Sequence, residues 1–141
     1  GSELLSESKT HLSATYPHVT QIPEEKVLKI EGKYPDFTVT SNKNTYKTQY
    51  IIVGIGSANT FDIEGLNQFV VPHQKALAEK QRIQLRNIDH KVIEGIYVIG
   101  TLAGCRSQLT IAAGSGAAVA TDLLTLWNEG IPVQVHDSNK K

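Results

Sequence analysis

The feature that most constrains the fold is the stretch Gly95–Gly116, GIYVIGTLAGCRSQLTIAAGSG, in which a short apolar run is followed by a run of very small side chains. The apolar run predicts a buried strand over 95–100, and the pattern after it predicts a helix over 108–128. Glycine inside a helix costs about 1 kcal/mol relative to alanine. Gly114 and Gly116 therefore indicate that something approaches this helix closely.

Two explanations account for the small residues at the start of this helix. They let the helix pack tightly on a strand, or they let a ligand come close to its backbone. The first N–H groups of a helix have no partner within the helix, and its amino end carries a partial positive charge, so a carbonyl or phosphate is favoured there. The residue pattern leaves both explanations open.

The rest of the chain predicts one α/β domain over 1–141. Val-, Ile-, Thr- and Tyr-rich runs separated by Pro, Gly and Asn predict an antiparallel β-meander over 15–48. Core strands and the C-terminal helix are expected in 49–60 and 95–130, where Tyr50–Val53 is continuously apolar, as in a strand covered on both faces. Further predicted elements are an amphipathic helix over 2–14, a helix over 72–80, a strand over 82–87 and a short edge strand within 133–141.

The run Gly54-Ile55-Gly56 after the predicted strand at 50–53 invites comparison with a dinucleotide-binding fingerprint. That fingerprint needs a third glycine three residues later, and Asn59 occupies this place. The residues that follow also lack a helical apolar period. A strand that ends in a glycine-containing turn is the better interpretation.

Composition and charge exclude several classes of partner. The 14 basic and 14 acidic residues balance and form no basic run, so we expect neither nucleic acid nor an anionic membrane surface. No apolar run approaches the roughly 20 residues of a membrane span, and no signal peptide is evident, so we expect a cytoplasmic protein. The single cysteine, Cys105, excludes an internal disulfide, and the five scattered histidines predict no zinc site. Gly1-Ser2 is typical of an expression vector, so the natural chain is expected to begin further upstream.

Two motifs resemble a known family. HKVIEGIYVIGTLAG, followed by SQLTIAAGSGAAVATDLL, resembles the C-terminal flavin-binding motif of the thioredoxin-reductase-like branch of the FAD/NAD(P)-dependent pyridine nucleotide-disulfide oxidoreductases. TQYIIVGIGSANT is similar to that family's strand followed by G-x-x-P-N-T, and the segment 19–48 resembles the small sheet inserted in its FAD domain. The resemblance covers residues 3–130 and implies a partial FAD/NAD(P)-binding domain of the Rossmann-like three-layer type.

The resemblance also implies which residues contact FAD. Gln108 matches the family's flavin-contacting glutamine, but Thr101 stands where the family has an aspartate that hydrogen-bonds the cofactor, so a charge-assisted bond is lost. Ser107 replaces a common arginine, and Ala58 stands where the family often has proline. The residues expected to bind the cofactor are Gly56, Gly100, Thr101, Ser107, Gln108 and Leu109.

Two nucleotide-binding units of the family are missing from the chain. There is no N-terminal G-x-G-x-x-G unit, and the roughly 30 residues between Asn59 and Lys91 are too few for an NAD(P)H domain. A sheet built from 50–53 and 96–100 alone would expose an edge and an apolar face. We therefore expect a homodimer, or a companion chain that completes the sheet.

Two functions from different classes follow. In the first, the chain is the FAD-binding portion of an NAD(P)H-dependent oxidoreductase, inactive by itself, and the flavin carries the hydride chemistry. In the second, it is a degenerate relative that has lost FAD and serves as a binding or assembly module. Cys105, in the loop beside the predicted site, is either a redox thiol or a small packing residue. We expect His73 on the surface of a helix, His90 in a loop, and Trp127 as an anchor of the last helix.

Overall fold

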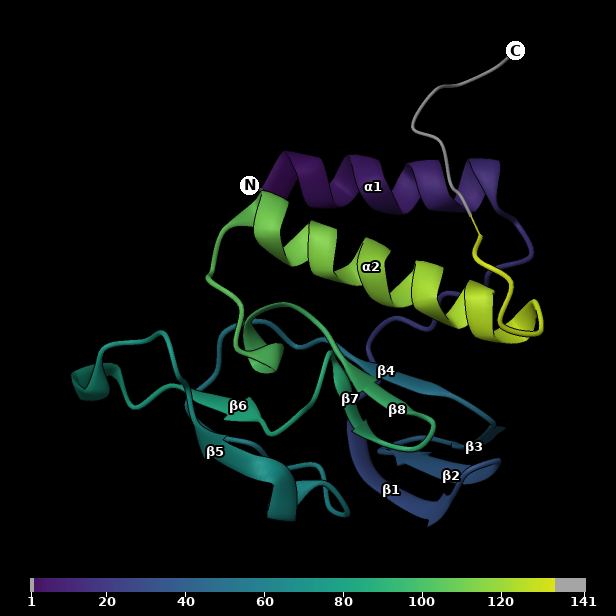
Figure 1. Cartoon of the computed structure of the whole chain (residues 1–141). Helices are drawn as coiled ribbons and strands as arrows, with labels where there is room; N and C mark the ends of the chain where they lie inside the picture. Colours follow the sequence, from purple (N-terminus) through teal and green to yellow (C-terminus); the bar gives the residue numbers. More distant parts are fainter. Residues whose placement is uncertain (1, 134–141) are drawn as a thin grey trace.

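The computed structural model describes residues 2–133, with side-chain burial described from residue 7 onward, and shows mixed helix and small sheets (Figure 1). The predicted helices at the two ends of the described chain are confirmed as α1 (Ser2–Thr15) and α2 (Leu109–Trp127). Apart from Val133, the predicted tail strand lies outside the described residues. The strands form a three-stranded meander, a second three-stranded sheet and a two-stranded hairpin.

The predicted meander is present, but it begins later than expected. β1 (Val27–Lys33), β2 (Asp36–Ser41) and β3 (Thr45–Thr48) form an antiparallel sheet in that order, and residues 16–26 are irregular. The carboxylate of Glu25 ties this irregular segment to the turn between β2 and β3. It accepts hydrogen bonds from Tyr46 Oη at 2.6 Å, Asn44 Nδ2 at 2.8 Å and Ser41 Oγ at 2.8 Å. These bonds, that of Tyr46 first, lower the pKa of Glu25.

The second sheet lies between the meander and α2 (Figure 1). β4 (Ile51–Val53) runs parallel to the central strand β8 (Ile96–Val98), and β7 (Lys91–Ile93) pairs antiparallel with β8 on its other side. Alternate residues of a strand point to opposite faces. Ile96 and Val98 belong to the same buried cluster as Phe37 of the meander. Ile99, just after β8, faces α2 instead, because its Cδ1 lies 3.6 Å from the place of a Cβ on Gly116.

Gly95, in the turn before β8, is required by both its conformation and its surroundings. Its φ is +83°, a value that other residues rarely adopt, and a Cβ there would lie 2.7 Å from the ring of Phe37. The meander and the β7–β8 hairpin therefore approach as closely as they do because position 95 carries no side chain.

The predicted helix over 72–80 is wrong. β5 (Val70–Pro72) pairs antiparallel with β6 (Ile83–Leu85), and the connection between them contains one short 3₁₀ helix, η2 (Ala78–Lys80). Another short 3₁₀ helix, η1 (Asn67–Phe69), precedes β5. The N–H of His73 donates to Arg82 O at 2.9 Å and extends the hairpin. A helix over 72–80 would have little apolar surface to bury, since Leu77 is the one large aliphatic residue of this segment. The predicted strand over 82–87 is confirmed as β6.

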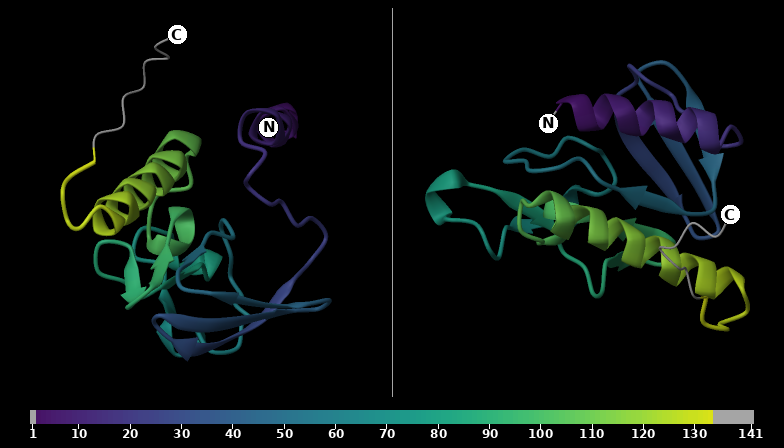
Figure 2. Two further views of the ribbon diagram at one scale, coloured as in Figure 1. Left: turned by 90° about the vertical axis from the view of Figure 1, so that its right-hand side faces the viewer. Right: turned by 90° about the horizontal axis from the view of Figure 1, so that it is seen from above.

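α2 is apolar almost all round, yet it buries only a narrow stripe. Its buried residues are Ser115, Val119 and Leu123, four residues apart, whereas Leu109 and Leu124 are exposed. Near its C-terminal end the ring of Trp127 meets Tyr50 with 5.4 Å between ring centroids, although Trp127 is 57% exposed. Figure 2 shows α1 offset to one side, so that it leaves much of α2 uncovered.

The length and composition of α2 also suffice for a membrane span. It has 19 residues, a mean hydropathy of 1.4 over its most apolar 18-residue window, and 17% of that window buried. One helix of this kind is weak evidence, because core helices pass the same test of length and composition. The absence of a membrane partner therefore stays a prediction.

The two glycines that first drew attention to α2 have different surroundings. A Cβ on Gly116 would make an ordinary contact with Ile99 at 3.6 Å, so packing on the sheet leaves room for a small residue there without requiring glycine. A Cβ on Gly114 would meet nothing within 4 Å. Packing within the described chain therefore does not compensate for the helix stability that is lost by having glycine at position 114.

Candidate functional site

The connection between β8 and α2 is fixed by one buried serine. The chain turns at Gly100, whose φ is +67°, and enters the short helix η3 (Gly100–Ala103). Ser115 Oγ accepts the Gly100 N–H at 2.7 Å and donates to Ala112 O at 2.7 Å. Ser115 is only 7% exposed, so this bond holds the second turn of α2 against the end of the strand away from water.

The amino end of α2 is left without a side-chain cap. Gln108 is the N-cap residue in an extended conformation, and its side chain makes no capping hydrogen bond. The first turn contains no acidic residue that would offset the positive end of the helix dipole. Its first N–H groups are thus available to an electron-rich group.

A hollow of about 350 Å³ lies beside this helix end. Thr101, Ser107 and Gln108 line it from the connection between β8 and α2, and Ser57 lines it from the loop after β4. The opposite wall comes from the β5–β6 hairpin and its connection. Three segments far apart in the sequence therefore meet at the carboxyl ends of the parallel strands β4 and β8.

Buried polar side chains hold the β5–β6 hairpin in this position. His73, only 8% exposed, places Nε2 at 3.2 Å from Cys105 O, and its Nδ1 accepts the Lys75 N–H at 3.1 Å. Because Nδ1 accepts, Nε2 carries the proton and donates to Cys105 O. Gln84 Oε1, also buried, accepts the Gln74 N–H at 2.9 Å. His73 is therefore a structural link and not the surface helix residue that the sequence suggests.

A second polar link joins the end of the hairpin to the last residue of η3. Asn87 Nδ2 donates to Ala103 O at 3.0 Å and to Leu85 O at 2.8 Å. His90 lies in a turn, as expected, with Nδ1 at 2.9 Å from Val98 O. Cys105 is half-buried against the main hydrophobic core and also lines the hollow. Its position is consistent with both predicted roles, a packing residue and a thiol beside the site.

The structure brings together half of the residues expected from the sequence. Thr101, Ser107 and Gln108 line the hollow. Gly100 is buried behind them, and Gly56 is exposed next to Ser57, with a φ of +75° and nothing within 4 Å of a Cβ. Leu109 opens α2 and is 65% exposed.

Sequence reasoning missed Ser115, His73 and Gln84. Ser115 sits within the small-residue run, where a lone hydroxyl between two glycines was a usable signal. No sequence signal pointed to His73 or Gln84, because their hydrogen bonds depend on the β5–β6 hairpin, which the local sequence does not predict.

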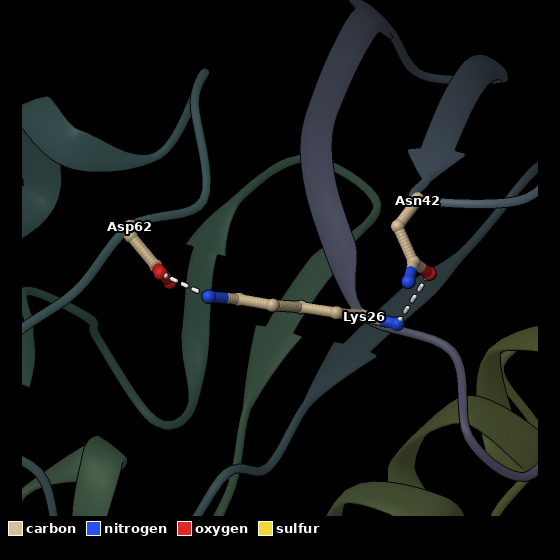
Figure 3. A network of polar contacts seen from close by, with 3 residues as sticks. All are labelled: Lys26, Asn42 and Asp62. Atoms are coloured by element: carbon tan, nitrogen blue, oxygen red, sulfur yellow. Dashed lines mark hydrogen bonds and ion pairs between the residues drawn. The ribbon is translucent and has the colours of Figure 1, made fainter.

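Other hollows of the described residues contain none of the predicted site residues, and two of them lie near the site or the meander. One of about 470 Å³ follows the β5–β6 hairpin, and one of about 390 Å³ lies between β1, β4 and the segment 62–63. Figure 3 shows Lys26 at the second: its N–H donates to Asn42 Oδ1 at 3.0 Å, and its ammonium group pairs with Asp62. These two charged side chains are 60% and 68% exposed, so the pair contributes little stability. Within residues 2–133 no cluster of His, Cys, Asp or Glu could hold a metal ion.

No model of a known protein family matches the chain, and no curated protein sequence matches it either. Among solved structures, the fold is similar to that of a ferredoxin-flavin thioredoxin reductase from Clostridium acetobutylicum, with a TM-score of 0.62. The match covers 90% of this chain and 78% of that chain at 14% identity. At this identity the likeness is one of fold, and at that level it agrees with the thioredoxin-reductase-like resemblance of the motifs.

Replacing Ser115 tests whether this serine holds α2 to the strand end. Ser115→Ala leaves the buried Gly100 N–H without its acceptor, so we expect the free energy of unfolding to fall by about 1–3 kcal/mol. Urea titration followed by circular dichroism measures the change. Thr121→Ala is the matched control, because its exposed hydroxyl donates only within α2, to Ala117 O. It should change stability by about 0.5 kcal/mol or less, and equal losses in both variants would contradict the assigned role of Ser115.

Proposed function

We propose that the chain is the flavin-binding part of a thioredoxin-reductase-like oxidoreductase and that FAD binds at the hollow beside the amino end of α2. The observation that carries the proposal is the meeting of Thr101 and Gln108 with the uncapped helix end at the carboxyl ends of β4 and β8. Ligands of parallel sheets bind at this edge. The arrangement of α2, the β4-β8-β7 sheet and the meander supports a Rossmann-like three-layer FAD domain (Figure 1).

The donors at the hollow fit the ring end of a flavin. The side-chain amide of Gln108 and the first N–H groups of α2 can donate to the ring carbonyl oxygens, and the positive helix end favours electron density there. Thr101 can make one neutral hydrogen bond to the ribityl chain. When bound, FAD supplies the hydride and electron transfer, and the chain's own residues bind and orient it.

The adenosine end of FAD has no comparable cradle within residues 2–133. The loop after β4 leads into irregular chain and not into a helix, so its Gly54-Ile55-Gly56 turn offers no helix end to a pyrophosphate. The proposal therefore includes a further polypeptide segment for that half of the cofactor. NAD(P)H as electron donor would likewise bind outside these residues, and a cytoplasmic location stays part of the proposal.

The second candidate function is a non-catalytic relative that has lost FAD and acts as a binding or assembly module. The observation that favours it is Thr101, which lies half-buried in the hollow without the negative charge that the family places there. A charge-assisted bond is roughly twice as strong as a neutral one, so its loss weakens any cofactor site.

Titration with FAD separates the two functions. We expect the purified protein to take up FAD, with quenching of flavin fluorescence and a visible flavin spectrum after desalting. Gln108→Ala removes one hydrogen bond and should weaken binding by about two- to tenfold. Gln68→Ala, an exposed glutamine away from the hollow, is the matched control and should leave binding unchanged. A colourless protein that takes up no FAD, also when expressed from the full natural gene, would leave only the second function.

The exposed face of α2 supports association as part of the proposal. Leu109, Ile111 and Leu124 of α2 are 65%, 38% and 41% exposed, and large apolar side chains exposed along one helix favour an interaction site. Gly114, with nothing near its Cβ position, is the point where another backbone can come closest. We propose a homodimer as the form this chain reaches alone, with a companion chain as the alternative.

Two substitutions at Gly114 test the association. Gly114→Ala has space for its methyl group and should raise the free energy of unfolding of the monomer by up to about 1 kcal/mol. Gly114→Leu should keep the monomer folded but abolish dimers, as measured by sedimentation velocity, because a bulky side chain blocks the close approach. A wild-type chain that stays monomeric at all concentrations, or that instead partitions onto lipid vesicles through α2, would contradict the homodimer.

A further inference from the structure

Four cationic side chains line the hollow together with the residues already described. Lys75, Lys80 and Arg82 come from the β5–β6 hairpin, and Arg106 comes from the loop before α2. Among residues 7–133, whose side chains are described, no carboxylate lines this hollow. The ion pairs of that range lie elsewhere, at Lys26, Lys29, Lys47 and Lys91, so no acidic side chain within it pairs with any of the four cations.

A cluster of like charges in a concave site raises the local potential. Field lines concentrate between low-dielectric walls, so anions are enriched there even though the whole chain has a net charge of +0. Folding brings these four cations together against their mutual repulsion, and an anionic occupant relieves that repulsion. Nothing in the sequence pattern suggests this, because Arg106 is 24 or more residues from the other three along the chain.

The other groups at the hollow are mostly hydrogen-bond donors. Ser57, Thr101 and Ser107 contribute hydroxyl groups, and Gln108 contributes an amide. Arg82 is half-buried, and its carbonyl oxygen accepts a hydrogen bond from the His73 N–H. The backbone that carries its guanidinium is therefore fixed at the edge of the hollow. A guanidinium fork with nearby hydroxyl donors matches the geometry of a phosphate group.

We infer that this hollow binds the phosphate group of a small phosphorylated ligand through Arg82, Arg106 and the two lysines. A small ligand is favoured over an acidic protein surface because the cations and the short hydroxyl donors line a concavity of about 350 Å³. The inference concerns the same hollow as the proposed flavin site and deepens it, since a flavin nucleotide and a nicotinamide nucleotide both carry phosphate. It requires no flavin ring, so it can hold where the flavin proposal fails.

Calorimetric titration with inorganic pyrophosphate tests the inference directly. We expect saturable binding that weakens as salt is raised. The double variant Arg82→Gln and Arg106→Gln should lose at least about tenfold in affinity, because two charge-assisted contacts are removed. Arg82→Lys with Arg106→Lys keeps the charge and should recover part of the loss.

The control removes equal charge elsewhere. Lys33→Gln with Lys43→Gln changes two exposed lysines of the meander and should leave pyrophosphate affinity within about twofold of the wild type. Circular dichroism establishes that each variant is folded. An equal loss in the control pair, or no pyrophosphate binding by the folded wild type, would overturn the inference, and so would binding of an acidic polypeptide alone.

Riboflavin, FMN, FAD and NADPH as further ligands separate this inference from the flavin proposal. If FMN and FAD bind more tightly than riboflavin and the arginine variants erase the difference, the phosphate belongs to the flavin nucleotide. If NADPH and pyrophosphate bind but riboflavin and the flavin nucleotides do not, the phosphate site holds and the flavin proposal fails. Equal affinities for riboflavin, FMN and FAD, unchanged in the arginine variants, would support flavin binding and overturn the phosphate site.

Discussion

The hydrogen bond from the Gly100 N–H to Ser115 Oγ is the interaction on which the candidate site depends. It joins the end of the central strand to the second turn of α2, two elements that share no regular backbone pairing. Because both groups are buried, the bond has no water to compete with it, and breaking it leaves a donor unsatisfied. The amino end of α2 is thereby held at the carboxyl ends of β4 and β8, where the hollow forms.

The meander covers one face of the β4-β8-β7 sheet, whereas α2, on the other face, leaves most of its own apolar surface exposed. Ile96 and Val98 share a buried cluster with Phe37 of the meander, and Gly95 lets the two layers touch. On the opposite side α2 buries only Ser115, Val119 and Leu123. The apolar remainder of α2 is what links the flavin proposal to association, since both require a segment that approaches the helix from outside the described residues.

The sequence predicted well the parts of the fold that have a local cause. The apolar run at 95–100 and the helical pattern over 108–128 correctly predicted β8 and α2, and the runs rich in Val, Ile, Thr and Tyr correctly predicted the meander. The resemblance to a flavin-binding motif predicted Thr101, Ser107 and Gln108 in one site, and the structure brings these three to one hollow.

The errors arose where distant contacts decide the structure. PHQKALAEK consists of good helix formers after a proline, yet the pairing of β5 with β6 and the buried hydrogen bonds of His73 outweigh that local preference. The basic wall of the hollow was equally hidden, because lysines and arginines on a hairpin resemble an ordinary solvated surface until the fold places Arg106 opposite them. In both cases the cause is a contact between residues that are not close in the sequence, and a local pattern of residue types carries no signal for such a contact.

The most direct measurement of the central claim, that the end of β8 and the start of α2 form a cofactor site, is amide chemical-shift mapping with FAD. The account predicts that the largest changes occur at Ser57, Thr101, Gln108 and the first residues of α2. Changes confined to another region, such as the hollow beside Lys26 and Asp62, or no changes at saturating FAD, would contradict it.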